Sequence, residues 1–82
     1  MDKSLRSQEY KLLVTLLRNA RKRQGVTQIE LARRLEVVQS WVSSCERGQR
    51  RLDIVEVWAW CKALGVSFPA LTKAFADQAE DL

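Results

Sequence analysis

Apolar residues recur every three or four positions along most of this chain of 82 residues, which is the spacing of one face of an α-helix. Thr27 with Glu30 and Asp53 with Glu56 are spaced as capping boxes, which mark helix starts, and a glycine follows three of the apolar segments. The pattern predicts five helices, over residues 7–23, 28–35, 39–47 and 54–64 and a last one after Ser67. We therefore expect an all-α fold with one domain over residues 1–82.

The expected helix 39–47 has one side that carries almost only short polar groups. At about 100° per residue, Val42 and Cys45 fall on the opposite side. Amide, hydroxyl and guanidinium groups match the donors and acceptors on base edges in the DNA major groove. This predicts a sequence-specific DNA-binding surface formed by Gln39, Ser40, Ser43, Ser44 and Arg47, with Trp41 and Glu46 on its rims. The two serines at 43 and 44 have an alternative interpretation as solvated residues.

The charge distribution agrees with a polyanionic partner. The chain has a formal net charge of +4, and residues 18–51 hold nine basic residues and three acidic ones, a local net charge of +6. The last nine residues contain three acids and no base. A basic centre of this kind favours nucleic acid as the partner, although a solvated basic surface has the same composition.

The sequence offers little for catalysis or metal binding. It contains no histidine, and Cys45 and Cys61 both fall within apolar helical patterns. This argues against zinc sites of the usual ligand number and predicts two small core residues in place of a disulfide. No activated nucleophile or carboxylate pair stands out, so we expect no enzyme, no cofactor and no metal site. The absence of a signal peptide and of a run of ~18 apolar residues favours a cytoplasmic protein.

The expected helix 54–64 is apolar nearly all round, with only Glu56 and Lys62 charged. Trp58 and Trp60 are two residues apart and cannot share a helical face. We therefore expect one of these tryptophans in the core and the other on the surface, as a contact for a second chain.

Three sequence strings together resemble one known family. They are R-x-x-x-G-x-T-Q-x-x-L-A-x-x-L over residues 21–35, V-x-Q-S-x-V-S-x-x-E-R-G over 37–48, and C-K-A-L-G-V over 61–66. The chain resembles the Cro and lambda-repressor-like (xenobiotic-response-element type) helix-turn-helix regulators of bacteria and phages, from about residue 13 to 71. The resemblance implies a five-helix DNA-binding domain whose helix-turn-helix spans residues 28–47.

The resemblance also implies roles for individual residues. Gln28 would contact a phosphate and brace Gln39, while Gln39, Ser40 and Ser44 would face bases with Ser43 beside them. The DNA backbone beyond the groove would be held by three arginines, Arg47, Arg50 and Arg51.

Two further positions connect the expected recognition helix to the rest of the domain. Arg21 would pair with Glu46 and tie the first helix to the third. Trp41, at the rim of the polar side, either stacks on the second helix, which leaves it partly packed, or lies against the sugar-phosphate backbone.

Two residues depart from the family pattern. Glu36 stands where the family usually has glycine in the turn, a position that requires positive φ, at a cost of about 1 kcal/mol. Val38 stands where a Ser or Thr normally caps the recognition helix, with a loss of about 1 kcal/mol of capping. Both changes are expected to loosen the third helix without preventing the fold.

The functional interpretation is a small transcriptional regulator, repressor-like, that binds operator DNA as a homodimer with one recognition helix in each major groove. It would act by occupying double-stranded DNA or by contacting RNA polymerase. The alternative is a protein-interaction module of the same fold, antitoxin-like or an adaptor, which uses the Trp58 side of the fourth helix and binds DNA weakly or not at all. The operator sequence and the dimer surface, either the outer face of the fourth helix or the fifth helix, stay open.

Overall fold

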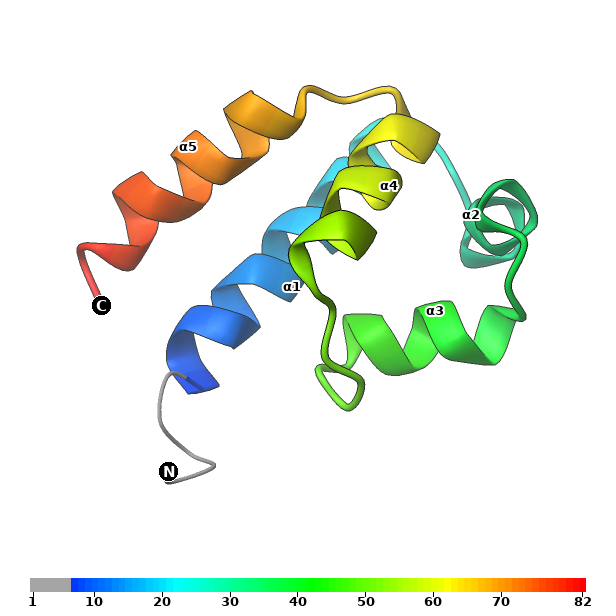
Figure 1. Ribbon diagram of the computed structural model, residues 1–82, viewed down its shortest axis with the longest axis horizontal. Helices are drawn as coiled ribbons and strands as arrows, with labels where there is room; N and C mark the ends of the chain where they lie inside the picture. Colours follow the sequence, from blue (N-terminus) through cyan, green and yellow to red (C-terminus); the bar gives the residue numbers. More distant parts are fainter. Residues whose placement is uncertain (1–6) are drawn as a thin grey trace.

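The computed structural model describes residues 7–82 (Figure 1). Five helices and no strand are present in that range: α1 (Ser7–Arg23), α2 (Gln28–Leu35), α3 (Gln39–Glu46), α4 (Ile54–Leu64) and α5 (Phe68–Ala79). The all-α, five-helix prediction is therefore confirmed. The third helix ends one residue earlier than predicted, because Arg47 serves as its C-cap with φ −85° and ψ 0°. The assignment of residues 1–82 to one domain stays a prediction, and its first six residues lie outside the described part.

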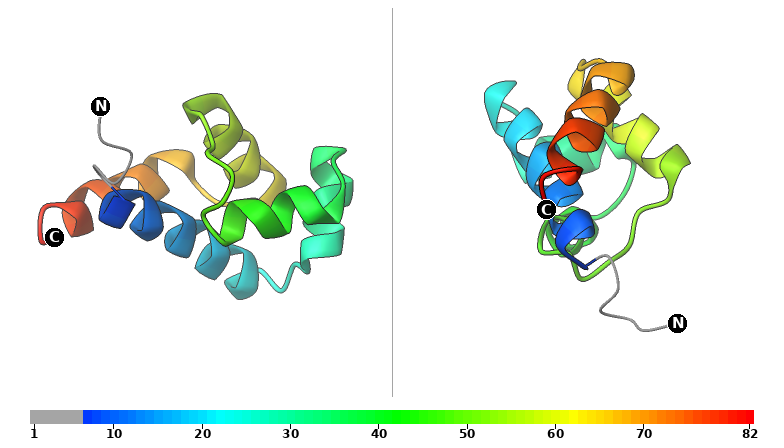
Figure 2. Two further views of the ribbon diagram at one scale, coloured as in Figure 1. Left: turned by 90° about the horizontal axis from the view of Figure 1, so that it is seen from below. Right: turned by 90° about the vertical axis from the view of Figure 1, so that its left-hand side faces the viewer.

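The long helix α1 is the support on which the other elements pack. It contacts α3, α4 and α5, while α2 packs against α3 and α4. Seen from below, α3 lies between α1 and α4, with α2 at one end of it (Figure 2). The α2–α3 pair thus stands at one end of the molecule, and its outer surface is left free by the other helices.

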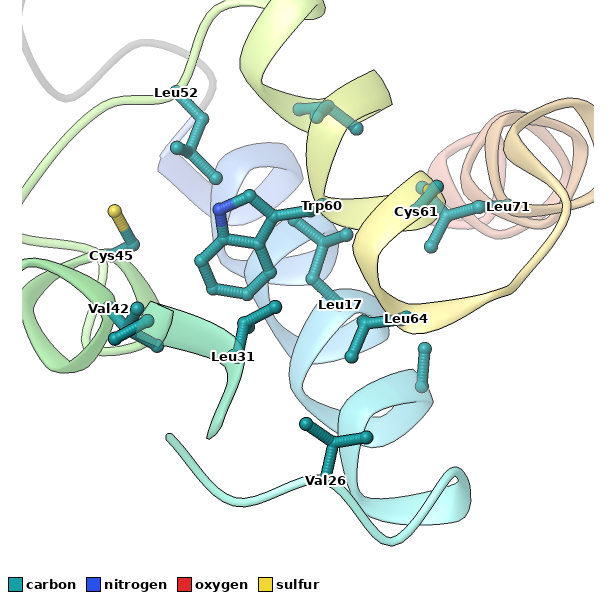
Figure 3. Close-up of a cluster of buried hydrophobic side chains, with 13 residues drawn as sticks. Leu17, Val26, Leu31, Val42, Cys45, Leu52, Trp60, Cys61, Leu64 and Leu71 are labelled. Carbon is teal, nitrogen blue, oxygen red and sulfur yellow. The ribbon is translucent and has the colours of Figure 1, made fainter. Parts of the chain in front are cut away.

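Trp60 lies at the centre of the core and is only 1% exposed. Its ring is surrounded by apolar side chains from different elements, among them Leu17 of α1, Leu31 of α2 and Val42 of α3 (Figure 3). Trp58, by contrast, is 47% exposed. The prediction that one tryptophan is buried and the other lies at the surface is confirmed, with Trp60 the buried one.

Both cysteines belong to the core, as predicted. Cys45 and Cys61 are buried and free, without a disulfide between them. Burial raises the pKa of the Cys45 thiol to about 11 and also raises the pKa of Cys61. The two thiols therefore stay neutral near pH 7 and act as small apolar groups.

The two predicted capping boxes differ in outcome. At α4, Asp53 Oδ1 accepts from the Glu56 N–H at 2.7 Å, and Glu56 Oε1 accepts from the Asp53 N–H at 2.8 Å, so that box is complete. At α2, Thr27 Oγ1 accepts from the Glu30 N–H at 3.0 Å, but the Glu30 carboxylate turns away toward two arginines. The second box is therefore only half formed, which corrects the sequence-based expectation.

A few apolar side chains lie at the edge of the core. Leu35 of α2 is only partly buried and packs against the core from its rim, as do Leu13 and Leu16 of α1. Tyr10 of α1 is also half-buried.

Candidate nucleic-acid interface

The polar side of α3 faces outward and its apolar side is fully covered. Val42 and Cys45 have no exposed surface and anchor the helix on the core. The residues predicted to face DNA bases lie on the outer side: exposed Gln39 and Ser40, and half-buried Ser43 and Ser44. The division of α3 that the sequence predicts is thus present in the structure, although the DNA contacts themselves stay predictions.

The turn between α2 and α3 has a left-handed backbone at Glu36, a conformation that is unfavourable for a residue other than glycine. Glu36 has φ 59° and ψ 44°, in the left-handed region, and its N–H points to the carbonyl groups of Ala32 and Arg33. Val38 precedes α3 in extended backbone, with no side-chain hydrogen bond to cap the helix. The positive φ expected at residue 36 and the missing side-chain cap expected at residue 38 are thus both present, while the loosening of α3 stays a prediction.

Arg21 and Glu46 connect α1 to the end of α3, as the resemblance implied. Arg21 Nε donates to Glu46 Oε2 at 2.6 Å and Nη2 donates to Glu46 Oε1 at 2.9 Å, a two-pronged contact. Arg21 Nη1 also donates to the Val26 carbonyl at 2.8 Å. The two side chains are only 10% and 3% exposed, so this ion pair is buried and fixes the position of the Glu46 carboxylate.

From Glu46 a chain of hydrogen bonds runs to the surface. Gln28 Nε2 donates to Glu46 Oε1 at 2.9 Å, and Gln39 Nε2 donates to Gln28 Oε1 at 3.2 Å. Because a carboxylate only accepts, Gln28 must turn its nitrogen toward Glu46 and its oxygen toward Gln39. Gln39 in turn must offer that oxygen an N–H. Its second N–H and its Oε1 are left side by side at the exposed start of α3.

Arg47 is held against the end of α3 by two neighbours. Its Nη1 donates to Ser43 Oγ, and its Nε and Nη2 donate to Gln49 Oε1 at 3.3 and 3.2 Å. Gln49 was not among the predicted site residues, since it has no helical periodicity and lies in the loop after Gly48. These contacts keep the Arg47 charge beside the outer side of α3.

Tyr10 holds the loop that carries Arg50 and Arg51, the two other arginines expected to bind the DNA backbone. Its hydroxyl donates to the Arg50 carbonyl and accepts from the Leu52 N–H, both at 2.9 Å. The Arg51 guanidinium lies over the Tyr10 ring, 4.3 Å from its centroid. Burial raises the pKa of Tyr10, which keeps the hydroxyl proton that the Arg50 carbonyl requires. No sequence pattern indicated this role, because the contacts join residues 40 and 42 positions apart.

Trp41 is partly packed, as expected, but its aromatic contact is with Trp60 of α4 and not with the second helix. Its ring centroid lies 6.3 Å from that of Trp60 in the core, with the two planes tilted by 50°. Its outer side is covered by the guanidinium of Arg50, 5.4 Å from the ring centroid. The indole therefore supports Arg50 from below and stays half-buried.

Arg33 and Arg34 lie on α2 as surface charges balanced by an acid. Both guanidinium groups bind the carboxylate of Glu30, and Arg34 Nη1 also donates to the Ala63 carbonyl at 2.8 Å. The hydrogen bonds from Arg33 and then Arg34 lower the pKa of Glu30 to about 2. The positive charge of α2 is thus partly neutralised within the helix itself.

The described residues contain no group of three or more Cys, Asp or Glu side chains arranged to hold a metal ion. In residues 7–82, no helix combines the length and apolar character that crossing a membrane requires.

The chain is similar to known helix-turn-helix proteins. A family model for a helix-turn-helix domain matches residues 12–75. An XRE-family-like protein from Pseudomonas syringae pv. tomato is 38% identical, with 93% of each chain covered and a TM-score of 0.86. The clp gene regulator ClgR from Corynebacterium glutamicum is 30% identical, with 84% of this chain and 88% of that chain covered and a TM-score of 0.75. A second crystal structure of ClgR has the same identity, covers 89% of this chain and 82% of that chain, and has a TM-score of 0.72. No curated protein matches the sequence significantly.

Proposed function

This chain belongs to the XRE/Cro-like helix-turn-helix family of DNA-binding transcription regulators, and we propose that it binds operator DNA as a homodimer, each α3 lying in a major groove. The observation that carries the proposal is the oriented amide of Gln39. It stands at the exposed N-terminal end of α3, and among residues 7–82 one of its N–H groups and its carbonyl oxygen have no hydrogen-bond partner. An adjacent donor and acceptor can form a pair of hydrogen bonds with a single base edge in the major groove.

The other proposed contacts are made either with DNA bases or with the DNA backbone. Ser40, Ser43 and Ser44 lie along the outer side of α3 and offer short hydroxyl groups to neighbouring bases. The guanidinium groups of Arg47, Arg50 and Arg51 lie beyond them and bind phosphates, which positions the helix without reading sequence. Gln28 adds a contact to a phosphate, and Trp41 contributes by supporting Arg50.

The regulator acts in the cytoplasm by occupying its operator or by contacting RNA polymerase, and no catalytic activity is assigned to it. The neighbours of similar structure include a gene regulator, ClgR, which supports this mode of action without identifying the genes controlled here.

The test is a mobility-shift titration against genomic fragments selected by the protein, repeated over a range of salt concentrations. With three arginines on phosphates, the logarithm of the binding constant should fall with the logarithm of salt with a slope of about −3 per half-site. Arg47→Ala should reduce this slope by about one, and Gln39→Ala should weaken only specific binding. The matched control is Gln78→Ala, an exposed residue of α5. If the protein selects no fragment, or if Arg47→Ala and Gln39→Ala both bind as the wild type does, the result favours a protein-interaction module.

A further inference from the structure

The outer face of α4 carries an exposed apolar patch, with the Lys62 Nζ over its Trp58 ring at 5.0 Å from the ring centroid. Ile54, Val55 and Trp58 are 69%, 65% and 47% exposed, and they lie within about 100° of one another around the helix. The opposite side of α4 is buried through Val57 and Trp60, together with other core residues. Large apolar side chains left in water over a continuous surface of this kind mark a site of protein contact.

The other surface considered for a second chain does not have this character. No large apolar side chain of α5 is exposed, and the residues that this helix does expose are Pro69, Ala70, Lys73, Ala76, Asp77 and Gln78. Burying them against another protein would remove water from charged groups without a comparable apolar gain. The choice between α4 and α5 therefore favours α4.

The position of the patch suits a second copy of the same chain. Seen from below, α4 lies next to α3 on the side away from α1 (left view of Figure 2). A two-fold axis that runs along this direction of view, just outside α4, places a second copy with its α3 facing the same way. Two recognition helices facing one side are what a symmetric operator requires, since half-site spacing follows the two-fold symmetry of the protein.

The charges around the patch also permit self-association. The basic residues are concentrated in 18–51, so two cationic copies repel one another least across α4, whose one basic residue is Lys62. At the N-terminal end of α4, Arg50 Nη2 lies 3.9 Å from Glu56 Oε2, and Asp53 caps the helix. An edge with both signs side by side is self-complementary, because a two-fold axis brings the basic part of one copy toward the acidic part of the other.

The patch is too small for a permanent dimer. Three side chains form a surface of at most a few hundred Å², whereas a stable complex of standard size buries roughly 800 Å² on each partner. Two copies held on adjacent half-sites, however, meet at a high effective concentration, at which a weak contact suffices. We propose that the face formed by Ile54, Val55 and Trp58 joins two copies of this chain on adjacent half-sites, and that this contact forms on DNA and not in free solution.

This inference rests on the proposed function and is tested on fragments selected by the wild-type protein, trimmed to carry one or both half-sites. The variant is the double substitution Ile54→Gln with Val55→Gln, at exposed positions that leave the net charge unchanged. Leu82→Gln, another exposed apolar residue, is the matched control. Circular dichroism and thermal unfolding establish that each variant is folded.

The wild type is expected to sediment as a monomer at micromolar concentration and to bind the two-site fragment cooperatively. The double variant should bind the single site within twofold of wild type and lose a cooperative gain of about tenfold. Unchanged cooperativity in the double variant, or a wild type that is already a dimer in solution, would overturn the inference while single-site binding upholds the proposed function. If no fragment is bound at all, the proposed function fails and the inference falls with it.

Discussion

Gln28 donates an amide N–H to the carboxylate of Glu46, 2.9 Å away at the end of α3, and therefore presents its oxygen to Gln39 at the start of that helix. The orientation of Gln39 follows from this contact, since an amide next to an acceptor must turn its N–H toward it. The buried Arg21–Glu46 pair thus determines, through two side-chain amides, which hydrogen-bonding groups the protein offers at the start of α3. The geometry of the core and the chemistry of the surface are linked by three hydrogen-bonded steps.

The first prediction concerns the base that Gln39 reads. With one N–H and one oxygen available, its amide matches the N7 acceptor and N6 donor of adenine. Gln39→Ala should lower affinity for the preferred operator by about 10- to 100-fold, the value of one such base contact. The measurement is selection from a random DNA library with wild type and variant, followed by binding constants for the selected sites.

An adenine should be preferred at one position of each half-site by wild type, and this preference should disappear in Gln39→Ala. Binding to non-specific DNA should change little, because it depends on the phosphate contacts. An unchanged preference at every position would contradict the assignment.

The second prediction concerns stability. Glu46→Gln preserves the shape of the side chain but leaves the Arg21 charge without its partner at a buried site. The free energy of unfolding should fall by about 3 kcal/mol, in the range found when one partner of a buried pair is removed. Urea unfolding followed by circular dichroism measures the change.

The control is Asp77→Asn, which breaks the Lys73–Asp77 pair on α5, where both side chains are largely exposed. This substitution should change stability by less than about 1 kcal/mol, as is usual for surface pairs. Equal effects of the two substitutions would show that burial does not strengthen the Arg21–Glu46 pair.

The third prediction concerns the turn before α3. Glu36 occupies the left-handed region at φ 59°, where a residue with a Cβ pays roughly 1–2 kcal/mol relative to right-handed backbone. Glu36→Gly removes this strain but also makes the unfolded chain more flexible, so we expect a net gain of about 0.5–1 kcal/mol. Thermal unfolding should show an increase of a few degrees in Tm.

The comparison for this substitution is Glu80→Gly, at the other end of the molecule, where φ is −62°. There glycine relieves no strain, and stability should fall or stay the same. A fall in Tm for Glu36→Gly would mean that the turn changes its backbone to accommodate the glutamate in solution.

The fourth prediction concerns the loop that carries Arg50 and Arg51. Tyr10→Phe removes the hydroxyl that joins the Arg50 carbonyl to the Leu52 N–H and leaves the ring under Arg51 in place. Stability should fall by about 1–2 kcal/mol, because the part-buried Leu52 N–H loses its partner. DNA affinity should fall by about 3- to 10-fold, since two arginines must then be ordered on binding.

Urea unfolding and mobility shift on the same preparation separate the two effects. Thr72→Val, which removes a hydroxyl bonded to the Pro69 carbonyl on α5, is the control for losing one hydroxyl far from the loop. It should leave DNA binding unchanged. A Tyr10→Phe protein that binds DNA as the wild type does would limit Tyr10 to a structural role.

The sequence by itself determined the helices, their caps and the two-sided character of α3. These features depend on residues three or four positions apart, and periodicity, Asp53 with Glu56, and the unfavourable Glu36 and Val38 could all be recognised without a structure. The resemblance added the Arg21–Glu46 pair and the bracing of Gln39 by Gln28, both of which the structure contains.

Only the tertiary structure decided which tryptophan is buried, that Tyr10 holds a loop 40 residues further along the chain, and that Gln49 binds Arg47. It also decided that the Glu30 carboxylate leaves its capping box for Arg33 and Arg34. The physical reason is that these outcomes depend on competition among partners brought together by helix packing. A local pattern states which groups a residue can bond, and the packing of α1, α3 and α4 selects among them.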